Sequence, residues 1–522
     1  MVARTSLWLD RAGSTGLLGP PGSADPGTPD AALPDGPVDA VVVGAGLTGL
    51  TTAVLLARAG CRVLVVEART VGAGTTGRST AKASLLQGGR LSGIARLHPD
   101  AAVRAYVEAG REGLDWLLRY ADEHGVPYQR REAVTYATTA AGRDRVDAEL
   151  AAARAAGLPV GWRRHVELPL PVLGAIGLAD QAQLDPVELL AALVRDLRTR
   201  GGEVVEGARV VGLRRGLDHT RRAASPGGSG RPLTVRTTRG DVQCDAVVLA
   251  TGVPVLDRGG FFARLEPLRS YALAFRGVAR PPAGMYLSVD DDSRSVRSTP
   301  AGSAELLLVG GAGHVVGRAA QTSRHERRLV RWTTDHFPGA ELTHTWSAQD
   351  YASADGLPLV GRLLPGDDRV LVATGFDKWG LTTGVAAALV LAAELLGRHV
   401  PGWAADWQPW RAHELAGWRT ALRLNGSAGV RLLGDWTRPW PAVGARPAPP
   451  EGQGRIERDG VRPVAVCTVG GVTRRMSAVC PHLGGIVAWD DAARSWDCPL
   501  HGSRFGPDGD LLEGPALRGL AH

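Results

Sequence analysis

The stretch Val38-Asp-Ala-Val-Val-Val-Gly-Ala-Gly-Leu-Thr-Gly49 decides how the chain is interpreted. Its β-branched run is typical of a buried strand, and three glycines follow at the spacing G-x-G-x-x-G. Gly44 allows a tight turn, Gly46 lets the backbone approach a pyrophosphate, and Gly49 lets the next helix pack closely on the strand. The stretch therefore predicts a strand–turn–helix unit that binds a dinucleotide.

Glu67 completes this pattern, because it ends the next predicted strand 18 residues after Gly49, close to the spacing of a dinucleotide-binding unit. Its carboxylate can accept hydrogen bonds from the hydroxyls of an adenosine ribose. The helix N-terminus offers unpaired N–H groups and a positive dipole end to the phosphates. The pattern alone does not distinguish FAD from NAD.

Outward from this unit, strand-like and helical runs alternate from residue 38 to about 423 and predict a Rossmann-like α/β fold. One helix has a clear start, with Asp185 as N-cap and Pro186 at the first helical position. The predicted strands are 38–44, 61–67, 203–214, 233–238, 242–250, 268–278, 304–310 and 369–374. The predicted helices are 47–59, 99–124, 141–156, 186–200, 321–336, 381–397 and 409–422.

The composition changes at both ends of this alternating region. Residues 11–37 are rich in Pro, Gly, Asp and Ser without periodicity, which indicates a flexible arm or a surface loop. Prolines gather again within 437–454, and short strands and turns follow. We expect an N-terminal arm at 1–37, an oxidoreductase-sized α/β domain at 38–425, a linker at 426–455 and a small all-β domain at 456–522.

Three later segments favour FAD over NAD as the ligand. A second glycine-rich loop, 72–82, follows the strand that Glu67 ends, and Gly252 ends a hydrophobic strand. The stretch 373–382 then leads from a strand into an apolar helix. Segments far along the chain are thus expected to contribute to the nucleotide site. Such a site suits a long ligand whose flavin lies far from its adenine.

Residues 38–423 resemble the FAD-dependent amine and amino-acid oxidoreductases of the D-amino-acid oxidase and glycine oxidase superfamily. The matching stretches are VVVGAGLTGL, TGRSTAKAS, WSAQDYASADGLPLVG and ATGFDKWGLTTG. The resemblance implies an FAD-binding domain interleaved with an α+β substrate domain, with the flavin against the last of these stretches. The FAD contacts that it implies in this chain are Gly44, Gly46, Gly49, Glu67, Thr80, Ala81, Val210, Gly252, Gly375, Gly380, Leu381 and Thr382.

Only two of the 60 basic residues are lysines, Lys82 and Lys378, and the resemblance places both beside the flavin. A lysine there could stabilise the reduced, anionic flavin or hold a water molecule, so both are candidate catalytic residues. The alternative is that they cap helix ends or bind an FAD phosphate. Weaker candidates for substrate contact, each more readily explained as structural, are Arg269, Tyr271, Tyr286, Arg297, Trp346 and Tyr351.

The C-terminal region contains two cysteine–histidine pairs, Cys480-Pro-His482 and, 15 residues later, Cys498-Pro-Leu-His501. Such pairs on Gly- and Pro-rich turns could bind zinc. Their contexts, CPHLGG and CPLHGSRF, resemble a Rieske domain instead. This resemblance implies a [2Fe-2S] cluster with both cysteines on one iron and both histidines on the other.

The chain also departs from some Rieske domains. Gly485 and Leu500 stand where respiratory-type domains carry a disulfide. Ser503 remains as a donor to a bridging sulfur, whereas Phe505 replaces a tyrosine that is frequent in high-potential forms. Since fewer hydrogen bonds to the sulfurs stabilise the reduced cluster less, we expect a potential in the lower half of the Rieske range of about −150 to +300 mV.

Composition excludes several other classes of protein. The 44% of hydrophobic and 22% of charged residues are typical of a globular chain. The net charge of +7 comes from scattered arginines, so we expect no nucleic-acid partner. The uncharged run 40–57 contains the glycine turn and the apolar run 385–396 is short, so no transmembrane segment is expected. The five cysteines and the lack of an export signal favour the cytoplasm.

These observations favour an oxidoreductase that oxidises an amine or amino acid at the flavin and passes electrons singly through the cluster to an external acceptor, with the direction of flow left open. We expect His482 and His501 at a solvent-facing edge, as the exit. Two alternatives are an electron-transfer module that serves a partner enzyme and an FAD oxidase that uses O2, its cluster being structural or regulatory. The tryptophans expected to pack the two domains together, or to complete the core, are Trp403, Trp407, Trp410, Trp418, Trp436 and Trp440.

Overall fold

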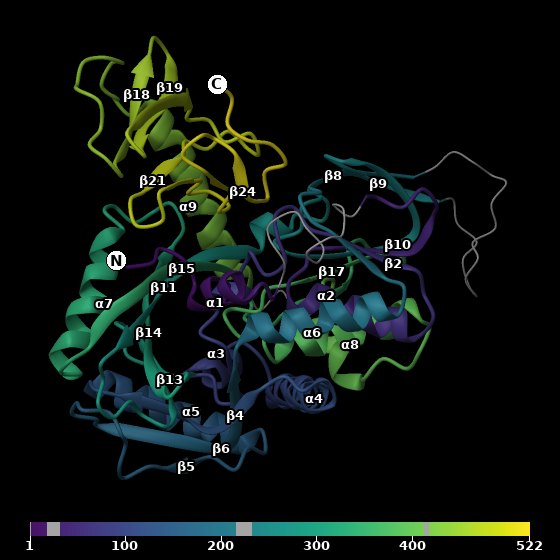
Figure 1. Cartoon of the computed structure of the whole chain (residues 1–522), viewed down its shortest axis with the longest axis vertical. Helices are drawn as coiled ribbons and strands as arrows, with labels where there is room; N and C mark the ends of the chain where they lie inside the picture. Colours follow the sequence, from purple (N-terminus) through teal and green to yellow (C-terminus); the bar gives the residue numbers. More distant parts are fainter. Residues whose placement is uncertain (1, 18–31, 216–231, 412–416) are drawn as a thin grey trace.

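The computed structural model describes residues 2–17, 32–215, 232–411 and 417–522. Two large sheets form one body, here called the main domain (residues 38–411). A smaller unit of short strands, the C-terminal domain (residues 454–522), sits on one end of it (Figure 1). The fold confirms the expected α/β domain with an interleaved α+β part and a small all-β domain.

The first sheet forms around β1 (Val38–Val43), which pairs in parallel with β2 (Val63–Val66) and β10 (Gly240–Gly252). Strands covered on both faces are almost continuously apolar, and Val63–Val66 is buried at every position. The other strands are β7 (Glu203–Val205), β8 (Val210–Arg215), β9 (Leu233–Thr237), β16 (Leu359–Arg362) and β17 (Val370–Thr374). The helices that pack with this sheet are α2 (Leu47–Arg58), α6 (Pro186–Thr199) and α8 (Thr383–Leu395), and α4 (Asp100–His124) packs on α8.

The second sheet is mixed and contributes the interleaved part of the main domain. Its long pair β11 (Leu265–Arg276) and β15 (Glu341–Ser353) is antiparallel over its whole length and stands at one edge of the sheet, β15 outermost. The remaining strands are β3 (Lys82–Ala83), β4 (Tyr128–Ala137), β5 (Gly161–Trp162), β6 (Gly174–Leu184), β12 (Met285–Ser288), β13 (Arg294–Ala301) and β14 (Ala304–Val315). Its flanking helices are α3 (Arg90–Ala95), α5 (Ala140–Ala155) and α7 (Ser323–His336).

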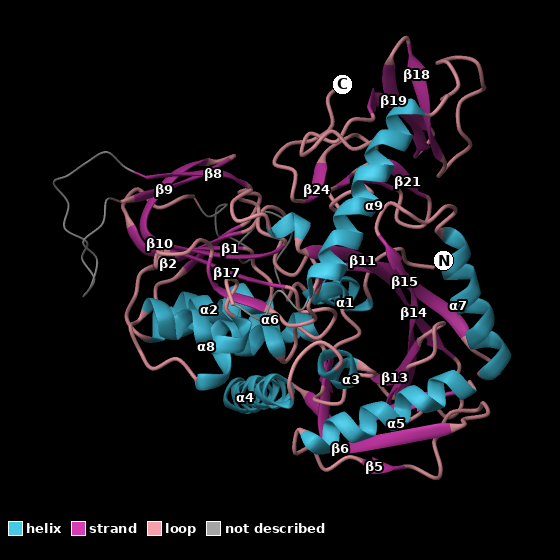
Figure 2. Ribbon diagram, turned by 180° about the vertical axis from the view of Figure 1, so that it is seen from behind, coloured by secondary structure: helices cyan, strands magenta, loops and turns pink. Residues whose placement is uncertain are grey.

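The C-terminal domain consists of two small antiparallel sheets. The helix α9 (Trp418–Thr437) runs along the back of the molecule from the main domain to this domain (Figure 2). The strands of the first sheet are β18 (Gly454–Asp459), β19 (Arg462–Val469) and β20 (Val472–Ser477). Those of the second are β21 (Ala488–Asp490), β22 (Ser495–Asp497), β23 (Arg504–Phe505) and β24 (Leu511–Glu513).

Several predicted elements differ from the observed ones. The predicted strand 203–214 is two strands, β7 and β8, because Gly207 turns the chain with φ 65° between them. The predicted helix 409–422 is wrong in its position: 412–416 lie outside the described residues, and α9 begins at Trp418 and continues through much of the expected linker to Thr437. In the main domain, the predicted elements omit helix α3 and the strands β3, β4, β5, β6, β12, β13, β15 and β16.

Part of the N-terminal arm is a helix that packs on the main domain. In α1 (Leu7–Thr15), Ser6 caps the first turn and Trp8 is completely buried. The indole N–H of Trp8 donates to the carbonyl of Ser79 at 2.7 Å. The arm therefore holds the glycine-rich loop 72–82 in place. The described residues contain no helix that combines the length and the apolarity needed to cross a bilayer.

Candidate functional site

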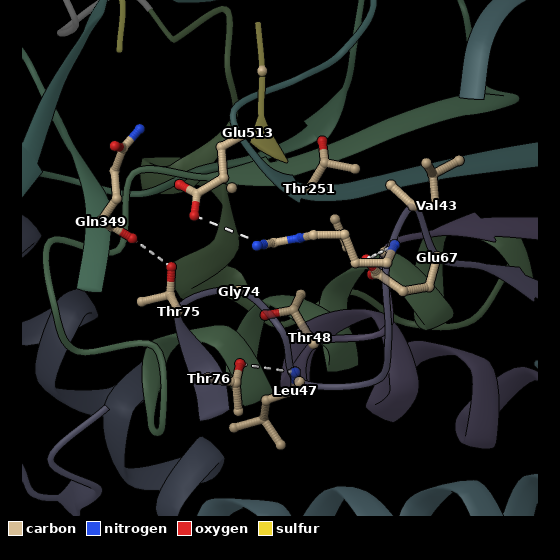
Figure 3. Close-up of a pocket in the computed structure, with 18 of the residues that line it drawn as sticks. Val43, Leu47, Thr48, Glu67, Gly74, Thr75, Thr76, Thr251, Gln349 and Glu513 are labelled. Atoms are coloured by element: carbon tan, nitrogen blue, oxygen red, sulfur yellow. Dashed lines mark hydrogen bonds and ion pairs between the residues drawn. The ribbon is translucent and has the colours of Figure 1, made fainter. Parts of the chain in front are cut away.

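Two adjoining cavities lie between the two sheets of the main domain. The first runs along the carboxyl ends of β1 and β2 and the N-terminus of α2 (Figure 3), and the second, of about 850 Å³, lies against β11, β13 and β14. A cavity of that size accommodates a small-molecule ligand. Four residues line both cavities and so mark their junction: Thr75, Ser79, Asp350 and Lys378.

The glycine turn has the geometry that the sequence predicts. Gly44 has φ 107°, and a Cβ there would lie 2.6 Å from the carbonyl oxygen of Ala250. A Cβ on Gly49 would lie 2.0 Å from the oxygen of Gly44, so any side chain would separate α2 from the turn. The helix N-terminus is thus left open toward the first cavity. This is the cradle that a pyrophosphate needs.

The carboxylate of Glu67 is fixed at the far side of this turn. It accepts hydrogen bonds from the N–H groups of Ala45 and Arg69, each at 2.9 Å. Figure 3 shows Glu67 beside the first cavity, below Val43. Its remaining lone pairs can accept from ribose hydroxyls. The cavity and its donors therefore fit the adenosine half of FAD.

The predicted cofactor residues separate into three sets. The first cavity is lined by Gly44, Gly46, Glu67, Val210, Gly252, Gly380 and Leu381, and the second by Thr80. Gly49, Ala81, Gly375 and Thr382 line neither cavity. They shape the backbone instead: Ala81 and Gly375 adopt positive φ values of 54° and 78°, and the hydroxyl of Thr382 donates to the carbonyl of Trp379 at 3.2 Å.

Lys82 lines the second cavity from a buried position. Its ammonium group donates to the hydroxyl of Ser295. Burial, and then the positive charge of Arg297, lower the pKa of Lys82 to about 7. Arg297 is itself buried, which lowers its pKa to about 9, and it donates to the carbonyl oxygens of Ala81 and Leu184. A lysine that exchanges its proton near neutral pH thus faces the second cavity.

Asp350 was not predicted, although it stands within the quoted stretch WSAQDYASADGLPLVG. Its carboxylate accepts hydrogen bonds from the N–H groups of Lys378 and Tyr351. Burial raises its pKa to about 6, and the nearby charge of Asp377 acts in the same direction. The junction of the cavities therefore holds a carboxyl group and, on Lys378, an exposed ammonium group.

The weaker substrate candidates have different roles. Tyr271 lines the second cavity and its hydroxyl lies 3.0 Å from Nε2 of His314. Tyr351 lines the first cavity. The indole of Trp346 donates to the carbonyl of Arg78 at 2.8 Å, and Tyr286 donates to Glu167 at 3.3 Å. These last two contacts are structural.

The two cysteine–histidine loops meet in the C-terminal domain. Cys480 and Cys498 are buried, free thiols whose hydrogen bond to each other lowers the pKa of Cys480 and raises that of Cys498. The backbone N–H groups of both loops point at the sulfurs. His482 and His501 lie next to each other, their ring centroids 5.2 Å apart. Nδ1 of His501 is buried and has no hydrogen-bond partner among the described residues. Two thiols and two imidazoles so arranged fit a [2Fe-2S] cluster.

The positions that carry a disulfide in other Rieske domains lie side by side here. A Cβ on Gly485 would be 2.7 Å from Leu500 and 3.1 Å from the sulfur of Cys498. Position 485 therefore needs a small residue, because the side chain of Leu500 occupies the space that the disulfide takes in those other domains. Ser503 lies at the cluster loops as predicted: its hydroxyl hydrogen-bonds to Cys480 and accepts from the N–H of Ala516 at 3.0 Å.

Replacing Ser503 by alanine should lower the reduction potential of the cluster. The variant removes one hydroxyl donor from the sulfur end of the site, and a hydrogen bond to a charged group is worth an amount that corresponds to a drop on the order of 50–100 mV. An EPR-monitored redox titration measures the change. Ser14→Ala, which removes an exposed hydroxyl of α1 that donates to the carbonyl of Arg11, is the control and should leave the potential unchanged. A Ser503→Ala potential equal to that of the wild type contradicts the assigned hydrogen bond.

A buried ion-pair cluster joins the C-terminal domain to the main domain. The guanidinium of Arg269 on β11 lies 3.2 Å from Asp490 and 3.0 Å from Asp497, and all three side chains are at most 3% exposed. Burial alone would lower the pKa of Arg269, but the two carboxylates outweigh it and raise the pKa. Asp497 directly precedes Cys498. Arg269 is therefore a fixed contact beside the cluster loop and no substrate residue.

Both cluster loops dock on the main domain. Arg318 donates to the carbonyl of Pro499 at 3.0 Å. The side-chain amide of Gln349 donates to the carbonyl of Gly502, next to His501, at 2.8 Å. Gln349 also lines the first cavity, where its own carbonyl accepts from Thr75 (Figure 3). One residue thus connects the wall of the cavity to a cluster loop.

The expectation of a solvent-facing histidine edge is wrong. The rings of His482 and His501 stand edge-on to the ring of Phe262, at centroid distances of 5.1 and 4.8 Å. Asp257 lies 3.5 Å from Nε2 of His482, whose side chain is only 7% exposed. The segment that follows β10 therefore covers the histidines, and the cluster end of the C-terminal domain is turned into the main domain.

The C-terminal domain also contributes to the first cavity. Leu512, Glu513 and Gly514 line it, and Figure 3 shows the carboxylate of Glu513 pointing into it. Glu513 lies 3.7 Å from Arg69, and Arg209 donates to the carbonyl of Leu511 at 2.7 Å. The cavity is thus complete only when the two domains are docked.

Of the clustered tryptophans, Trp403 and Trp407 are buried in the core of the main domain. Trp440 packs against the core of the C-terminal domain, and Trp436 donates to the carbonyl of Gly484 at 2.9 Å. Trp410 and Trp418 are largely exposed. Only the last pair of the connector therefore packs on the small domain.

Two family models match this chain. One, described as FAD dependent oxidoreductase, covers residues 39–394, and the other, described as Rieske [2Fe-2S] domain, covers residues 440–522. Among curated proteins, the Rieske 2Fe-2S iron-sulfur protein YhfW of Bacillus subtilis (strain 168) is 29% identical over 92% of each chain. The cytochrome b6-f complex iron-sulfur subunit of Chlorobaculum tepidum is 40% identical over 74 residues, 14% of this chain and 41% of its own.

Solved structures show the same fold for the main domain. L-proline dehydrogenase from P. horikoshii and glycine oxidase from Geobacillus kaustophilus each superpose with a TM-score of 0.58 at 18% identity. They cover 72% of this chain and 98% and 99% of their own. At this identity the similarity concerns the fold.

Proposed function

Because the chain belongs to the FAD dependent oxidoreductase family and carries a Rieske [2Fe-2S] domain, we propose that it oxidises a small amine or amino acid and passes the electrons singly through the cluster to an external acceptor. It is an enzyme whose cofactors are FAD and a [2Fe-2S] cluster. The substrate, the acceptor and the route between the cofactors belong to the proposal.

The observation that carries this proposal is the docking of the cluster loops on the wall of the FAD cavity. Gln349 contacts both the cavity and Gly502, and Glu513 of the C-terminal domain lines the cavity. The rings of both histidines stand edge-on to Phe262 of the main domain, so the cluster end of the C-terminal domain is turned toward it. Such an arrangement favours electron exchange inside one chain over exchange between separate molecules.

FAD supplies a two-electron acceptor and the [2Fe-2S] cluster exchanges one electron at a time. The C–H bond next to the nitrogen of the neutral amine would break with transfer of its hydride to bound FAD, leaving an iminium ion that takes up water and gives a carbonyl compound, the free amine or ammonia and one proton. The proton that travels with the hydride is released when its two electrons leave. Two electrons per substrate then leave in two single steps to a one-electron acceptor. Reduction of two acceptor molecules therefore balances each oxidation.

Lys82 and the residues at the junction of the cavities have separable roles in this proposal. Lys82 places an ammonium group, with a pKa of about 7, where negative charge develops during the reaction. The carboxyl group of Asp350, with a pKa of about 6, holds the backbone of Lys378 and Tyr351. The glycine turn and Glu67 position the adenosine half, so that the reactive ring lies at the second cavity.

The test is rapid mixing of the purified holoenzyme with a panel of amines and amino acids, without oxygen and with absorbance followed at flavin and cluster wavelengths. The proposal predicts that one of these substrates bleaches the flavin first and the cluster afterwards. A variant with Cys480→Ser and Cys498→Ser serves as the control, since its flavin should bleach and then stay reduced when a one-electron acceptor is added.

The other outcomes are equally informative. A flavin that is reduced and then reoxidised by O2, while the cluster never changes, contradicts the relay and indicates an oxidase. A flavin that no amine or amino acid reduces contradicts the substrate class and favours an electron-transfer module.

A further inference from the structure

Helix α9 is apolar on two opposite sides, and only one of them is packed. On the packed side, Leu424 and Ala428 are each 8% exposed, and Asn425 donates to the carbonyl of Ala263 at 2.8 Å. The other side carries five large apolar side chains, with exposed fractions of 52% for Trp418, 63% for Leu422, 73% for Val430, 71% for Leu433 and 43% for Trp436. Helices that are apolar all round are normally buried. At one end Trp436 also contacts the C-terminal domain, through its hydrogen bond to Gly484, whereas the other four side chains are more than half exposed.

The exposed residues form one continuous line along the helix. At 3.6 residues per turn, one face collects Trp418, Leu422, Gly426, Gly429, Leu433 and Trp436; this set is called the α9 stripe. No atom outside the helix lies within 4 Å of where a Cβ on Gly426 or Gly429 would stand. Figure 2 shows α9 on the outer surface of the molecule along its whole length. A second helix can therefore reach the stripe.

The stripe is nearly the same when it is followed in either direction. Leu422 lies four residues before Gly426, and Leu433 lies four residues after Gly429. The tryptophans lie at the two ends, eight residues before the first glycine and seven after the second. A surface that pairs with itself about a two-fold axis must be self-complementary in this way. A groove for an unrelated partner has no such requirement.

The size of the stripe suits a small specific interface. A whole aromatic side chain offers about 150–250 Å², so the half-exposed tryptophans and the two leucines, with Val430 beside them, leave several hundred Å² of apolar surface per copy. Apolar patches of that size on a monomer mark interaction sites. Two copies together reach on the order of 1,000 Å², the lower bound of a specific interface.

We propose that two copies of this chain associate through their α9 stripes, antiparallel, about a two-fold axis between Gly426 and Gly429. Leu422 then packs against Leu433 of the second copy, and the glycines let the two backbones approach closely. The tryptophans close both ends. This association is independent of the electron route and of the substrate.

The first test is the mass of the holoenzyme in sedimentation velocity runs over a range of concentrations. We expect about 109 kDa, twice the 54.7 kDa of one chain, with dissociation on dilution. Leu433→Glu should raise the dissociation constant at least about a hundredfold, because it buries an unpaired charge twice in one interface. Val461→Glu, at a site 83% exposed in the C-terminal domain, is the matched control and should leave the dimer intact.

The register has its own test. The double variant Leu422→Lys with Leu433→Glu should restore the dimer, since opposite charges then face each other twice across the axis. In a parallel pairing, each introduced charge would instead face the same residue of the second copy, and like charges would repel. If the double variant does not restore the dimer while Leu433→Glu alone still disrupts it, the antiparallel register is contradicted. Both leucines are exposed, and an unchanged circular dichroism spectrum shows that the variants fold.

Two further results would overturn the proposal. One is a wild-type chain that remains a monomer at concentrations of about 100 µM, well above the range in which specific interfaces form. The other is a monomer that floats with vesicles of anionic phospholipid and loses this binding on Leu433→Glu, since the arginines beside the stripe would then serve a membrane surface.

Discussion

With FAD supplied at saturating concentration, because undocking also opens the first cavity, Arg269→Met is expected to leave substrate-driven reduction of the flavin within about twofold of the wild-type rate while it disconnects the cluster from the flavin. Arg269 does not line the second cavity; it lies between Asp490 and Asp497, is completely buried, and touches the wall of the first cavity through its hydrogen bond to the side chain of Gln349 at 2.9 Å. The change therefore separates the chemical step from the onward transfer of electrons.

The size of the effect follows from the two carboxylates that Arg269→Met leaves behind. Removing one partner of a buried ion pair costs about 3–5 kcal/mol, a factor of at least about a hundred in the docking equilibrium. Undocking moves Cys498 and His501 away from Gln349 and Phe262, the residues that connect them to the main domain. Cluster reduction should slow accordingly.

The measurement is the rapid-mixing experiment described above, with both chromophores followed in one run. Arg276→Met is the matched control: Arg276 lies on the same strand and pairs with Glu341 at 2.8 Å, but both side chains are more than 60% exposed. Such surface pairs contribute little, so this variant should behave as wild type. If the cluster is reduced at the same rate in the Arg269→Met and Arg276→Met variants, the role given to the buried ion pairs of Arg269 is contradicted.

Lys82→Met is expected to make the protein more stable and much less active. The pKa of Lys82 is about 7 in the folded chain and about 10.4 in an unfolded one. Between these values the unfolded state binds more protons, so the lysine destabilises the fold, fully below pH 7 and not at all above about pH 10.5. Methionine carries no charge at any pH and removes this effect.

The expected gain in the free energy of unfolding is about 2–4 kcal/mol at pH 6, after the loss of the hydrogen bond to Ser295, and close to zero at pH 10.5. Denaturant titrations at the two pH values measure it. The rate of flavin reduction should fall by a factor of about 10²–10³, the usual effect of losing a charge-stabilising group in an active site. The wild-type rate profile should show an inflection near pH 7 that the variant lacks.

Lys378→Met provides the comparison, because Lys378 is the second lysine at the cavities but is exposed. Lys378→Met should leave the free energy of unfolding unchanged, and its rate profile should keep the inflection near pH 7. A Lys82→Met variant with wild-type rates at every pH would show that this lysine only packs the loop, whatever its effect on stability.

The sequence predicts those parts of the site that are local in the chain. The glycine turn, Glu67 and the two cysteine–histidine loops are each contained within a few residues of fixed spacing, and in each case the chemistry requires that residue type. Lys82 is noticeable because the chain otherwise uses arginine. Asp350 stood in a quoted stretch but carried no signal that distinguished it from its polar neighbours.

The parts that were not predicted depend on distant partners. Arg269 and Asp497 are 228 positions apart, and neither strand shows in its own residues that it will meet the other. The same holds for β4, whose neighbour β12 comes about 150 residues later. The propensity of a strand depends on what covers it. The histidine edge was misplaced for the same reason, because Phe262 approaches it from another domain.

The contribution of Leu512, Glu513 and Gly514 to the FAD cavity has a consequence for how the holoenzyme retains its flavin. Any ligand that binds only the docked form strengthens docking by its own binding free energy, so bound dinucleotide joins the two domains like a structural element. By the same linkage, weaker docking of the C-terminal domain should weaken retention of the flavin.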